Sequence, residues 1–422
     1  MKRILCPLLL SFCIHSPLTA ASDADVETLT RLNASGDAAS AFQLATSMLP
    51  TWEGDPAFDR QYALAALESG HASEAIFALE RLLMLDPQDN SARSDIARAY
   101  ALLSREPLLL GIDPLAAARE ATPLQQTFSG SLRVGGGYGE NVDAGPDSNV
   151  MMTPSGEVTV AGLRQRNDTF GSLELNGLYR FPLGSTWRGF VEGRMASRFY
   201  NEADDLDSLS MLLRTGALLE QDRTRWELSL HGQQYRLDDS RFLTTYGLAT
   251  DYLYGLSDGL AVGFFASVNR QDYAISDLDS NLLLAGLKVN WKLVHQLDPL
   301  IYAGFYRGWE EPLKQNAVSA GRTERDLLAG YAGVRLELSE KLWANLEGAL
   351  VNSRYDGPFQ LIVPATGNAR RDDFLELKLD LGWRMDERWS GQLRYSFHDN
   401  ASNTDVLEYR RQQIELMLQY GF

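Results

Sequence analysis

The sequence predicts an α + β multidomain protein in which a short N-terminal helical domain of tetratricopeptide-repeat type precedes a 14-stranded antiparallel transmembrane β-barrel. Three observations predict this fold. The chain opens with a secretory signal, residues 22–122 carry a helical repeat, and residues 123–422 form a series of long alternating segments that ends on Phe422.

Composition limits the class of protein. Of the 422 residues 45% are hydrophobic and only 2 are Cys, which excludes a disordered chain and a disulfide scaffold. The formal net charge of -17 repels phosphate backbones, so we expect no nucleic-acid partner. No apolar run of about 20 residues follows the N-terminus, which excludes an α-helical membrane protein but leaves a membrane barrel open.

Residues 1–21 have the pattern of a signal peptide. Two basic residues precede the apolar stretch 4–14, and the small residues after it end at Ala21, where we expect cleavage. An N-terminal membrane anchor is the alternative, but the apolar stretch is too short to span a bilayer. Cys6 and Cys13 both leave with the signal, so the mature chain has no thiol for a disulfide or a metal.

Residues 22–122 are rich in Ala and Leu and predict a periplasmic domain of tetratricopeptide-like helices. A pattern recurs there at roughly the 34-residue period of such repeats, and Gly70, Ala75 and Pro87 are its packing positions. Gly70 falls in the turn between two helices, Ala75 lets them cross closely, and Pro87 ends the second helix. An ordinary small helical bundle is the alternative.

Residues 123–422 predict the barrel. In segments such as 283–293 and 375–385, apolar and polar residues alternate over ten or more positions, whereas strands of soluble sheets usually have about five or six. A tilted strand needs about 9–11 residues to cross a bilayer. A soluble β-sandwich with long strands is the alternative. Fourteen such segments begin near Phe128, Gly171, Trp187, Leu209, Trp226, Thr244, Leu260, Leu282, Leu300, Asp326, Leu342, Asp373, Ser390 and Leu407.

The connections between these segments predict a location. Even-numbered connections are short and most odd-numbered ones are long and polar, as in outer-membrane barrels. An even number of strands puts both ends of the barrel on the periplasmic side, so we expect the helical domain in the periplasm, directly beneath the pore. Leu416, Leu418, Tyr420 and Phe422 form the expected barrel-insertion signal. We therefore expect the barrel-assembly machinery and outer-membrane lipid as partners.

The polar faces of the strands predict a charged lumen. Their signs are mixed, which predicts internal salt-bridge ladders, or a lumen for a chemically varied chain, rather than a path for an acidic polysaccharide. No His is paired by spacing with Ser and an acid, so we expect no enzyme, no cofactor and no metal site. The candidate lumen-lining residues are Glu192, Arg194, Arg198, Arg214, Lys288, Lys292, Arg335, Glu376 and Lys378.

The run Gly135-Gly136-Gly137 lies inside the first predicted strand. Glycine weakens a strand interior and often marks a bulge or a close approach of backbones. The run therefore predicts either a bend that the barrel needs for closure, or a seam with the last strand that opens laterally.

Two stretches carry a resemblance to a known family. Leu85-Asp86-Pro87 is followed by the Ala-rich helix 92–100, and 132–138 leads into Gly139-Glu140-Asn141-Val142 and then Asp147-Ser148-Asn149-Val150. With the signal peptide and the domain order, this resembles the surface lipoprotein assembly modifier family over essentially the whole mature chain. The resemblance implies a translocator for a client lipoprotein or secreted protein, with repeats that engage the client, a barrel that serves as conduit, and no catalytic residues.

Exopolysaccharide exporters share this outline and are the alternative, followed by a general porin. Their repeat domains are longer, because they reach toward the inner membrane, whereas about 90 residues of helix cannot bridge the periplasm. Protein translocation is therefore the function that the sequence favours.

Overall fold

The computed structural model describes residues 23–69, 71–86, 89–103, 127–146, 150–153, 156–159, 165–274, 278–359 and 368–422. The predicted signal peptide, Gly70 and Pro87 lie outside these ranges. No helix among the described residues has the length and apolar character that a membrane span requires.

Among the described residues, five helices precede the first strand, and successive helices pack on one another. Asp37 and Asp55 cap two of them, because each carboxylate accepts a backbone N–H of the first turn. Ala75 is fully buried in the core of this helical domain. Whether the helices are tetratricopeptide units stays a prediction. The helices are α1 (Asp23–Ser35), α2 (Ala38–Trp52), α3 (Pro56–Glu68), α4 (Ala72–Leu85) and α5 (Asn90–Leu103).

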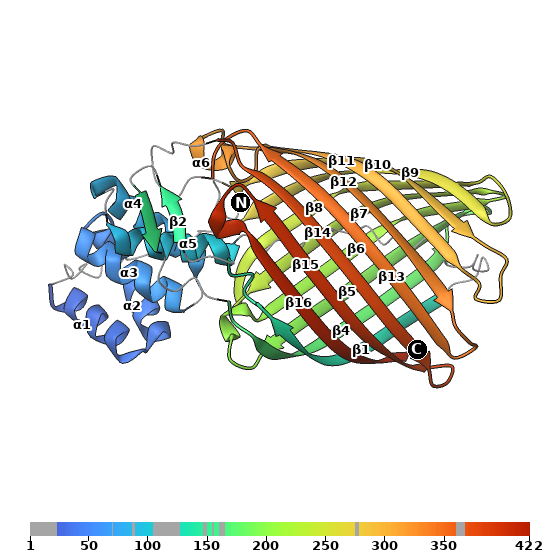
Figure 1. The fold of residues 1–422 in the computed structure, drawn as a ribbon, viewed down its shortest axis with the longest axis horizontal. Coiled ribbons are helices and arrows are strands. Elements are labelled where there is room, and N and C mark those ends of the chain that lie inside the picture. The colour runs from blue at the N-terminus through green and yellow to red at the C-terminus, as the bar shows by residue number, and fades with distance from the viewer. Residues whose placement is uncertain are drawn as a thin grey trace, which may run out of the picture.

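Fourteen long strands then close an antiparallel barrel, as the sequence predicted (Figure 1). Closure is made by β1 (Thr127–Glu140), which pairs with both β4 (Asp168–Pro182) and β16 (Tyr409–Gly421). Each predicted start lies within four residues of the observed one. The other barrel strands are β5 (Trp187–Tyr200), β6 (Ser208–Gln221), β7 (Thr224–Leu237), β8 (Ser240–Gly255), β9 (Leu260–Tyr273), β10 (Ser280–Lys292), β11 (Leu300–Pro312), β12 (Arg325–Glu337), β13 (Leu342–Tyr355), β14 (Arg371–Arg384) and β15 (Trp389–Ser402).

Short elements occupy some connections. A hairpin of β2 (Val150–Thr153) and β3 (Gly156–Thr159) follows β1, and it was not predicted because its strands are too short to show alternation. The single turns η2 (Asp204–Leu206), α6 (Ala317–Ala320) and η4 (Asp405–Leu407) lie in later long connections.

Side chains alternate between the outer wall and the lumen along the barrel strands, and the pairing of β7 with β8 shifts register at Tyr235 and Arg236. On β16, Leu416 and Leu418 face outward and are 56% and 42% exposed, whereas Glu415 and Met417 between them face inward and are buried. Tyr420 continues this outer face, and the Trp389 ring lies 4.9 Å from it. An apolar outer wall with aromatic rings near its edge is typical of a barrel that crosses a membrane.

The two mouths of the barrel differ. Thr127 and Phe422 lie at the end with the short turns, which we call the short-turn mouth, and the long connections gather at the other end, the long-connection mouth (Figure 1). Helices α4 and α5 lie at the long-connection mouth, where α5 contacts η4.

This placement differs from the expectation of helices beneath the short turns. The reason is that the long connections offer apolar side chains against which the helices can pack. Long-connection residues such as Val142, Leu206, Phe242 and Tyr273 are buried in one continuous cluster with the core of the helices. The short turns also carry apolar residues, such as Leu183, Val294 and Leu338, but these side chains stay exposed instead of joining a buried cluster. Burying apolar groups therefore favours the long-connection mouth.

Candidate functional site

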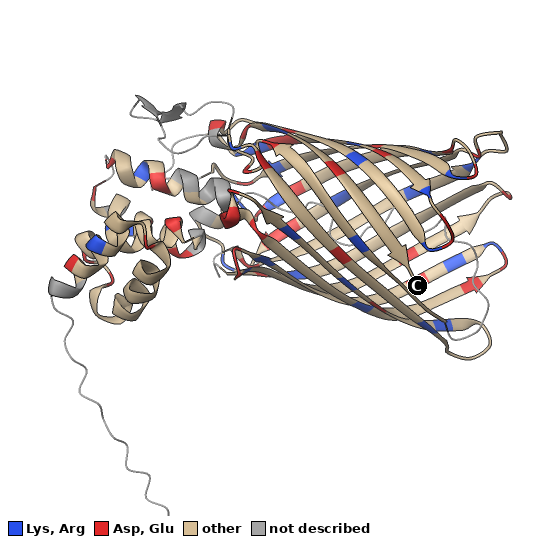
Figure 2. Cartoon of the chain, turned by 90° about the horizontal axis from the view of Figure 1, so that it is seen from below, with Lys and Arg blue, Asp and Glu red and all other residues tan. Residues whose placement is uncertain are grey.

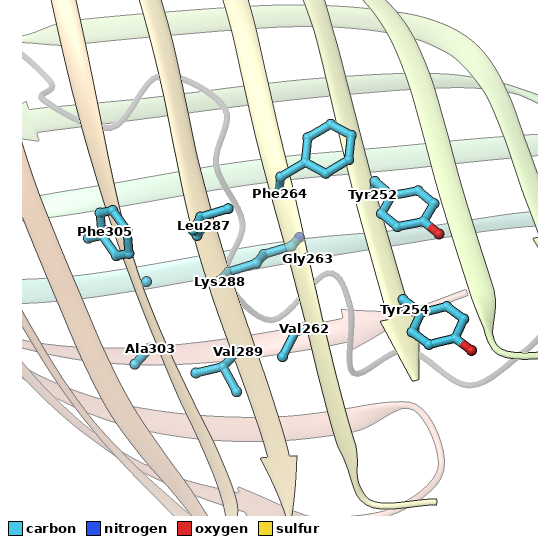
Figure 3. A pocket seen from close by; sticks show the side chains of 11 residues that line it. Tyr252, Tyr254, Val262, Gly263, Phe264, Leu287, Lys288, Val289, Ala303 and Phe305 are labelled. Atoms are coloured by element: carbon cyan, nitrogen blue, oxygen red, sulfur yellow. The ribbon is translucent and has the colours of Figure 1, made fainter. Parts of the chain in front are cut away.

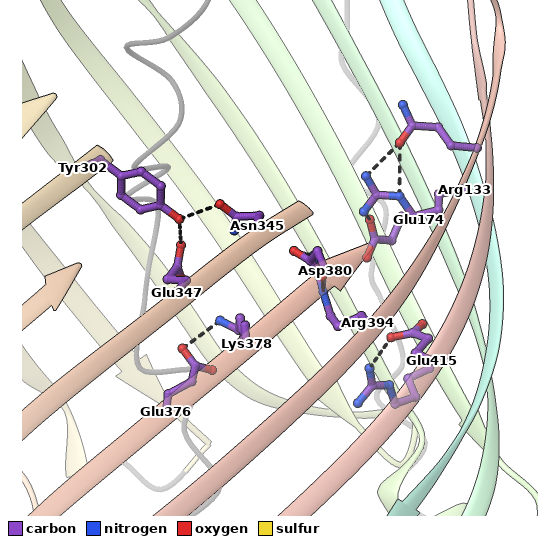
Figure 4. A network of polar contacts seen from close by, with 12 residues as sticks. Arg133, Glu174, Tyr302, Asn345, Glu347, Glu376, Lys378, Asp380, Arg394 and Glu415 are labelled. Atoms are coloured by element: carbon purple, nitrogen blue, oxygen red, sulfur yellow. Dashed lines mark hydrogen bonds and ion pairs between the residues drawn. The ribbon is translucent and has the colours of Figure 1, made fainter. Parts of the chain in front are cut away.

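Charged residues lie on strands all around the barrel (Figure 2), and side chains from several of these strands project into the lumen (Figure 4). Strand parity positions them, because residues two apart on a strand share a face. Barrel closure then brings strands that are far apart in sequence to face one another across the lumen.

The first group of lumen charges joins β5, β6 and β7. Glu192 is only 4% exposed, and its carboxylate accepts from Arg194 Nε at 2.7 Å and from Arg214 Nη2 at 2.5 Å. Arg214 also donates to Glu227 at 2.5 Å. A buried carboxylate between two guanidinium groups is compensated, so these predicted residues form a cross-strand ladder.

A second group lies on β14 and β15 (Figure 4). Glu376 accepts from Lys378 Nζ at 2.7 Å and contacts His398 Nε2 at 2.9 Å. One step further along the same strands, Asp380 accepts from Arg394 Nε at 2.8 Å. His398, which the sequence left without a partner, is thus part of a charge-compensated ladder.

A third group was missed by the sequence. Tyr302 on β11 is 1% exposed, and its hydroxyl donates to Glu347 at 2.8 Å and lies 3.2 Å from Asn345 Oδ1 (Figure 4). Tyrosine counts as apolar in an alternation pattern, so nothing marked this one as lumen-facing. Its cross-strand partner Gly333 was the available signal, because a Cβ there would lie 2.3 Å from the Tyr302 ring.

Three further predicted residues lie apart from these groups, and Arg198 lies beside β16, 3.1 Å from Gln413. Lys288 is buried and bonds to Asp251. Lys292 lies at the short-turn mouth, where its exposed side chain pairs with Asp298 at 3.1 Å. The Arg335 guanidinium lies 4.5 Å above the ring of Trp343. None of these three joins the ladders described above.

The seam between β1 and β16 is paired from Ser131 to Glu140. On its lumen side, Arg133 donates to Glu174 of β4 at 2.7 Å and to Gln419 of β16 at 2.8 Å. The hydrogen bonds of Arg133 therefore tie three strands together across the seam.

The glycine run lies within this paired seam. Gly135 and Gly137 face inward, where a Cβ on Gly137 would lie 2.4 Å from the Ile414 carbonyl oxygen and 2.6 Å from the Phe170 ring. Gly136 faces outward, and the nearest atom to a Cβ placed there would be the Phe170 carbonyl oxygen, 3.6 Å away. The inward glycines are therefore required by close packing inside the barrel.

The outer wall carries an apolar hollow of about 560 Å³ across β8 to β11 (Figure 3). Tyr252, Phe264, Leu287 and Phe305 surround it, and Lys288 is the one charged residue at its lining, with its amine directed to Asp251. A hollow of this composition on the outer wall faces the hydrocarbon of a membrane.

At the long-connection mouth, a buried ion pair joins β11 to β12. Glu310 is 2% exposed and accepts from Arg325 Nε at 2.6 Å and from the Ser280 hydroxyl at 2.6 Å. Arg325 also donates to the Tyr355 hydroxyl at 2.9 Å. Within the described ranges, no group of three His, Cys, Asp or Glu residues is arranged to hold a metal ion.

A closed barrel of long antiparallel strands, with an apolar outer wall and a charged lumen, defines an outer-membrane β-barrel protein. Residues 130–422 match the family described as "Surface lipoprotein assembly modifier". The chain belongs to this family, as its sequence suggested. The family is one of outer-membrane transport barrels, and the helical domain lies outside the barrel.

Solved structures with a similar fold are outer-membrane barrels. The channel DcaP of Acinetobacter baumannii is 12% identical with a TM-score of 0.42, and the alignment covers 70% of this chain and 97% of that one. A Pseudomonas aeruginosa FadL homologue is 9% identical with a TM-score of 0.41, covering 70% and 90%. This likeness is one of fold alone. No curated protein has significant sequence similarity to this chain.

Proposed function

We propose that this protein delivers a specific lipoprotein or secreted protein to the cell surface, with the helical domain engaging the client and the barrel acting as its conduit. The observation that carries the proposal is membership of the surface lipoprotein assembly modifier family through the barrel itself.

The lumen is suited to a chemically varied polypeptide. Its acidic and basic groups are paired in ladders, such as Glu192 with Arg214 and Asp380 with Arg394, so neither sign dominates the lining. A pore selective for one sign of charge would line its path with the opposite sign. A passing polypeptide of either charge thus meets no uniform repulsion.

The helical domain is placed to meet a client at one mouth. Its core is continuous with apolar residues of the long connections, so a client at that mouth meets helices and rim together. In the proposal, the helices hold the client there, and the barrel passes it on without nucleotide hydrolysis.

Deletion of residues 23–103 tests the role of the helices. The truncated barrel is expected to insert and keep its folded mobility on unheated gels, while surface display of the client is lost. The client itself is identified beforehand by crosslinking the tagged full-length chain in intact envelopes, followed by proteomic and glycan analysis. Unchanged display after the deletion would contradict a role for the helices. Enrichment of glycosyltransferases or bound polymer in place of one exported protein would move the chain to polysaccharide export.

A further inference from the structure

Two neighbouring lumen-facing residues of β16 hold hydrogen-bond donors that no acceptor satisfies. Gln413 is 7% exposed, and its amide nitrogen has no hydrogen-bond partner. Arg411 lies two residues away on the same face, and its buried Nε also has none. Buried donors without acceptors destabilise a folded protein, so such a pair calls for an explanation.

The charge at this point is also uncompensated. Among the described residues, no carboxylate lies within ion-pair distance of Arg411, whose guanidinium contacts the Tyr200 hydroxyl at 3.2 Å. The like-charged Arg198 lies close enough to interact with it. By contrast, Arg394 in the same lumen has Asp380 at 2.8 Å.

Arg198 reaches this point from β5. Its Nη1 donates to Gln413 Oε1 at 3.1 Å, which directs the Gln413 oxygen to Arg198 and leaves the amide nitrogen as the free end. Its Nη2 is 3.4 Å from Glu415, a carboxylate that also accepts from the Ser172 hydroxyl at 2.5 Å. Glu415 is therefore shared, and it serves Arg198 rather than Arg411.

Glycines make room for this convergence. Two strands, β4 and β1, separate β5 from β16, and β1 presents Gly135, Gly137 and Gly139 on its inward face. A Cβ on Gly139 would lie 2.7 Å from Val142 Cγ1 and 3.4 Å from the Gln413 amide nitrogen. Side chains at these positions would fill the space into which the donors point.

We propose that Arg411, Arg198 and Gln413 form a lumen site for an oxyanion, either a carboxylate or a phosphate group. Guanidinium groups bind both with paired N–H donors, and the Gln413 amide adds a neutral donor. Such a ligand supplies the acceptors that the free donors lack and the negative charge that Arg411 lacks. The site is independent of the proposed translocation.

The test is calorimetric titration of the full chain in non-ionic detergent with inorganic phosphate, glycerol 3-phosphate and acetate. We expect wild type to bind at least one of these anions. Binding of phosphates alone assigns the site to a phosphate, glycerol 3-phosphate standing for a lipid headgroup. Binding of acetate alone assigns it to carboxylates such as those of a polypeptide. The proposal is overturned if none of the three binds.

Variants distinguish a specific anion site at Arg411 from non-specific attraction by the positive charges of the lumen. Arg411→Gln should weaken binding about tenfold or more, whereas Lys292→Gln, which removes a cation at the short-turn mouth, should leave it unchanged. Gln413→Glu places a carboxylate among the same donors, so it should abolish anion binding and raise the melting temperature. Equal weakening in Arg411→Gln and Lys292→Gln would contradict the site. Folded mobility on unheated gels identifies variants that have inserted correctly.

Discussion

Arg198 of β5 donates to Gln413 of β16 across two intervening strands, with 3.1 Å between Nη1 and Oε1. The contact passes over the inward glycines of β1, and Phe170 fills part of the same space, 4.2 Å below the Arg198 guanidinium. The close packing at the seam and the free donors of Arg411 and Gln413 therefore both depend on the inward glycines of β1.

Gly137→Ala should destabilise the barrel by about 1–3 kcal/mol, because the new Cβ would lie 2.4 Å from a backbone oxygen. Gly136→Ala is the matched control on the outward face, where nothing lies closer than 3.6 Å, and it should leave the stability unchanged or slightly higher. Urea titration of the folded fraction measures both. A Gly137→Ala protein as stable as Gly136→Ala would show that the seam is not packed as described.

The buried pair at the long-connection mouth allows a second comparison. Glu310→Gln should cost about 3 kcal/mol, because it leaves the Arg325 guanidinium buried without its carboxylate. Asp326→Asn removes an ion pair of similar length, 2.8 Å to Arg307, but both of its side chains are more than half exposed. It should cost less than about 1 kcal/mol. The same urea titration tests this, and equal losses would contradict the assigned burial.

The sequence predicted the strands well because long alternation is a local signal that a half-exposed barrel strand must carry. It predicted less where the outcome depends on contacts distant in sequence. The Tyr302 ring fits inside the lumen because Gly333 on the next strand has no side chain. In the same way, Gly137 makes room for the Phe170 ring on a neighbouring strand. The docking of the helices depends on apolar residues scattered over several long connections, which no local pattern groups together.

Asp238 links helix docking to pH. It lies in the turn between β7 and β8 near His71, and burial, with the charges of Asp204, Asp205 and Asp239, raises its pKa from 3.8 to about 6 although His71 opposes the shift. The folded state therefore binds this proton more tightly than the unfolded state does. Its contribution to stability grows as the pH falls through about 6 and is lost as the pH rises.

Asp238→Asn should accordingly flatten the rise in melting temperature of the helices between about pH 7 and pH 4. Far-ultraviolet dichroism follows the helices specifically, because the barrel contributes mainly strand signal. Asp258→Asn, in a short turn at the other mouth, is the control and should keep the wild-type slope. An unchanged slope in Asp238→Asn would mean that this carboxylate does not titrate at the docked interface.

Cysteine labelling tests the docked arrangement in the membrane, since the only native cysteines, Cys6 and Cys13, belong to the predicted signal peptide. Ser47→Cys on α2, Glu202→Cys in a long connection and Ser257→Cys in a short turn each present an exposed position. With the helices docked on the long-connection mouth, Ser47→Cys and Glu202→Cys should share their accessibility to an impermeant maleimide in intact cells, and Ser257→Cys should show the opposite accessibility. Permeabilised cells, in which all three should react, provide the control. If Ser47→Cys instead followed Ser257→Cys, the helices would lie at the short-turn mouth in the membrane, and the apolar rim around Leu206 and Phe242 would be open to another partner.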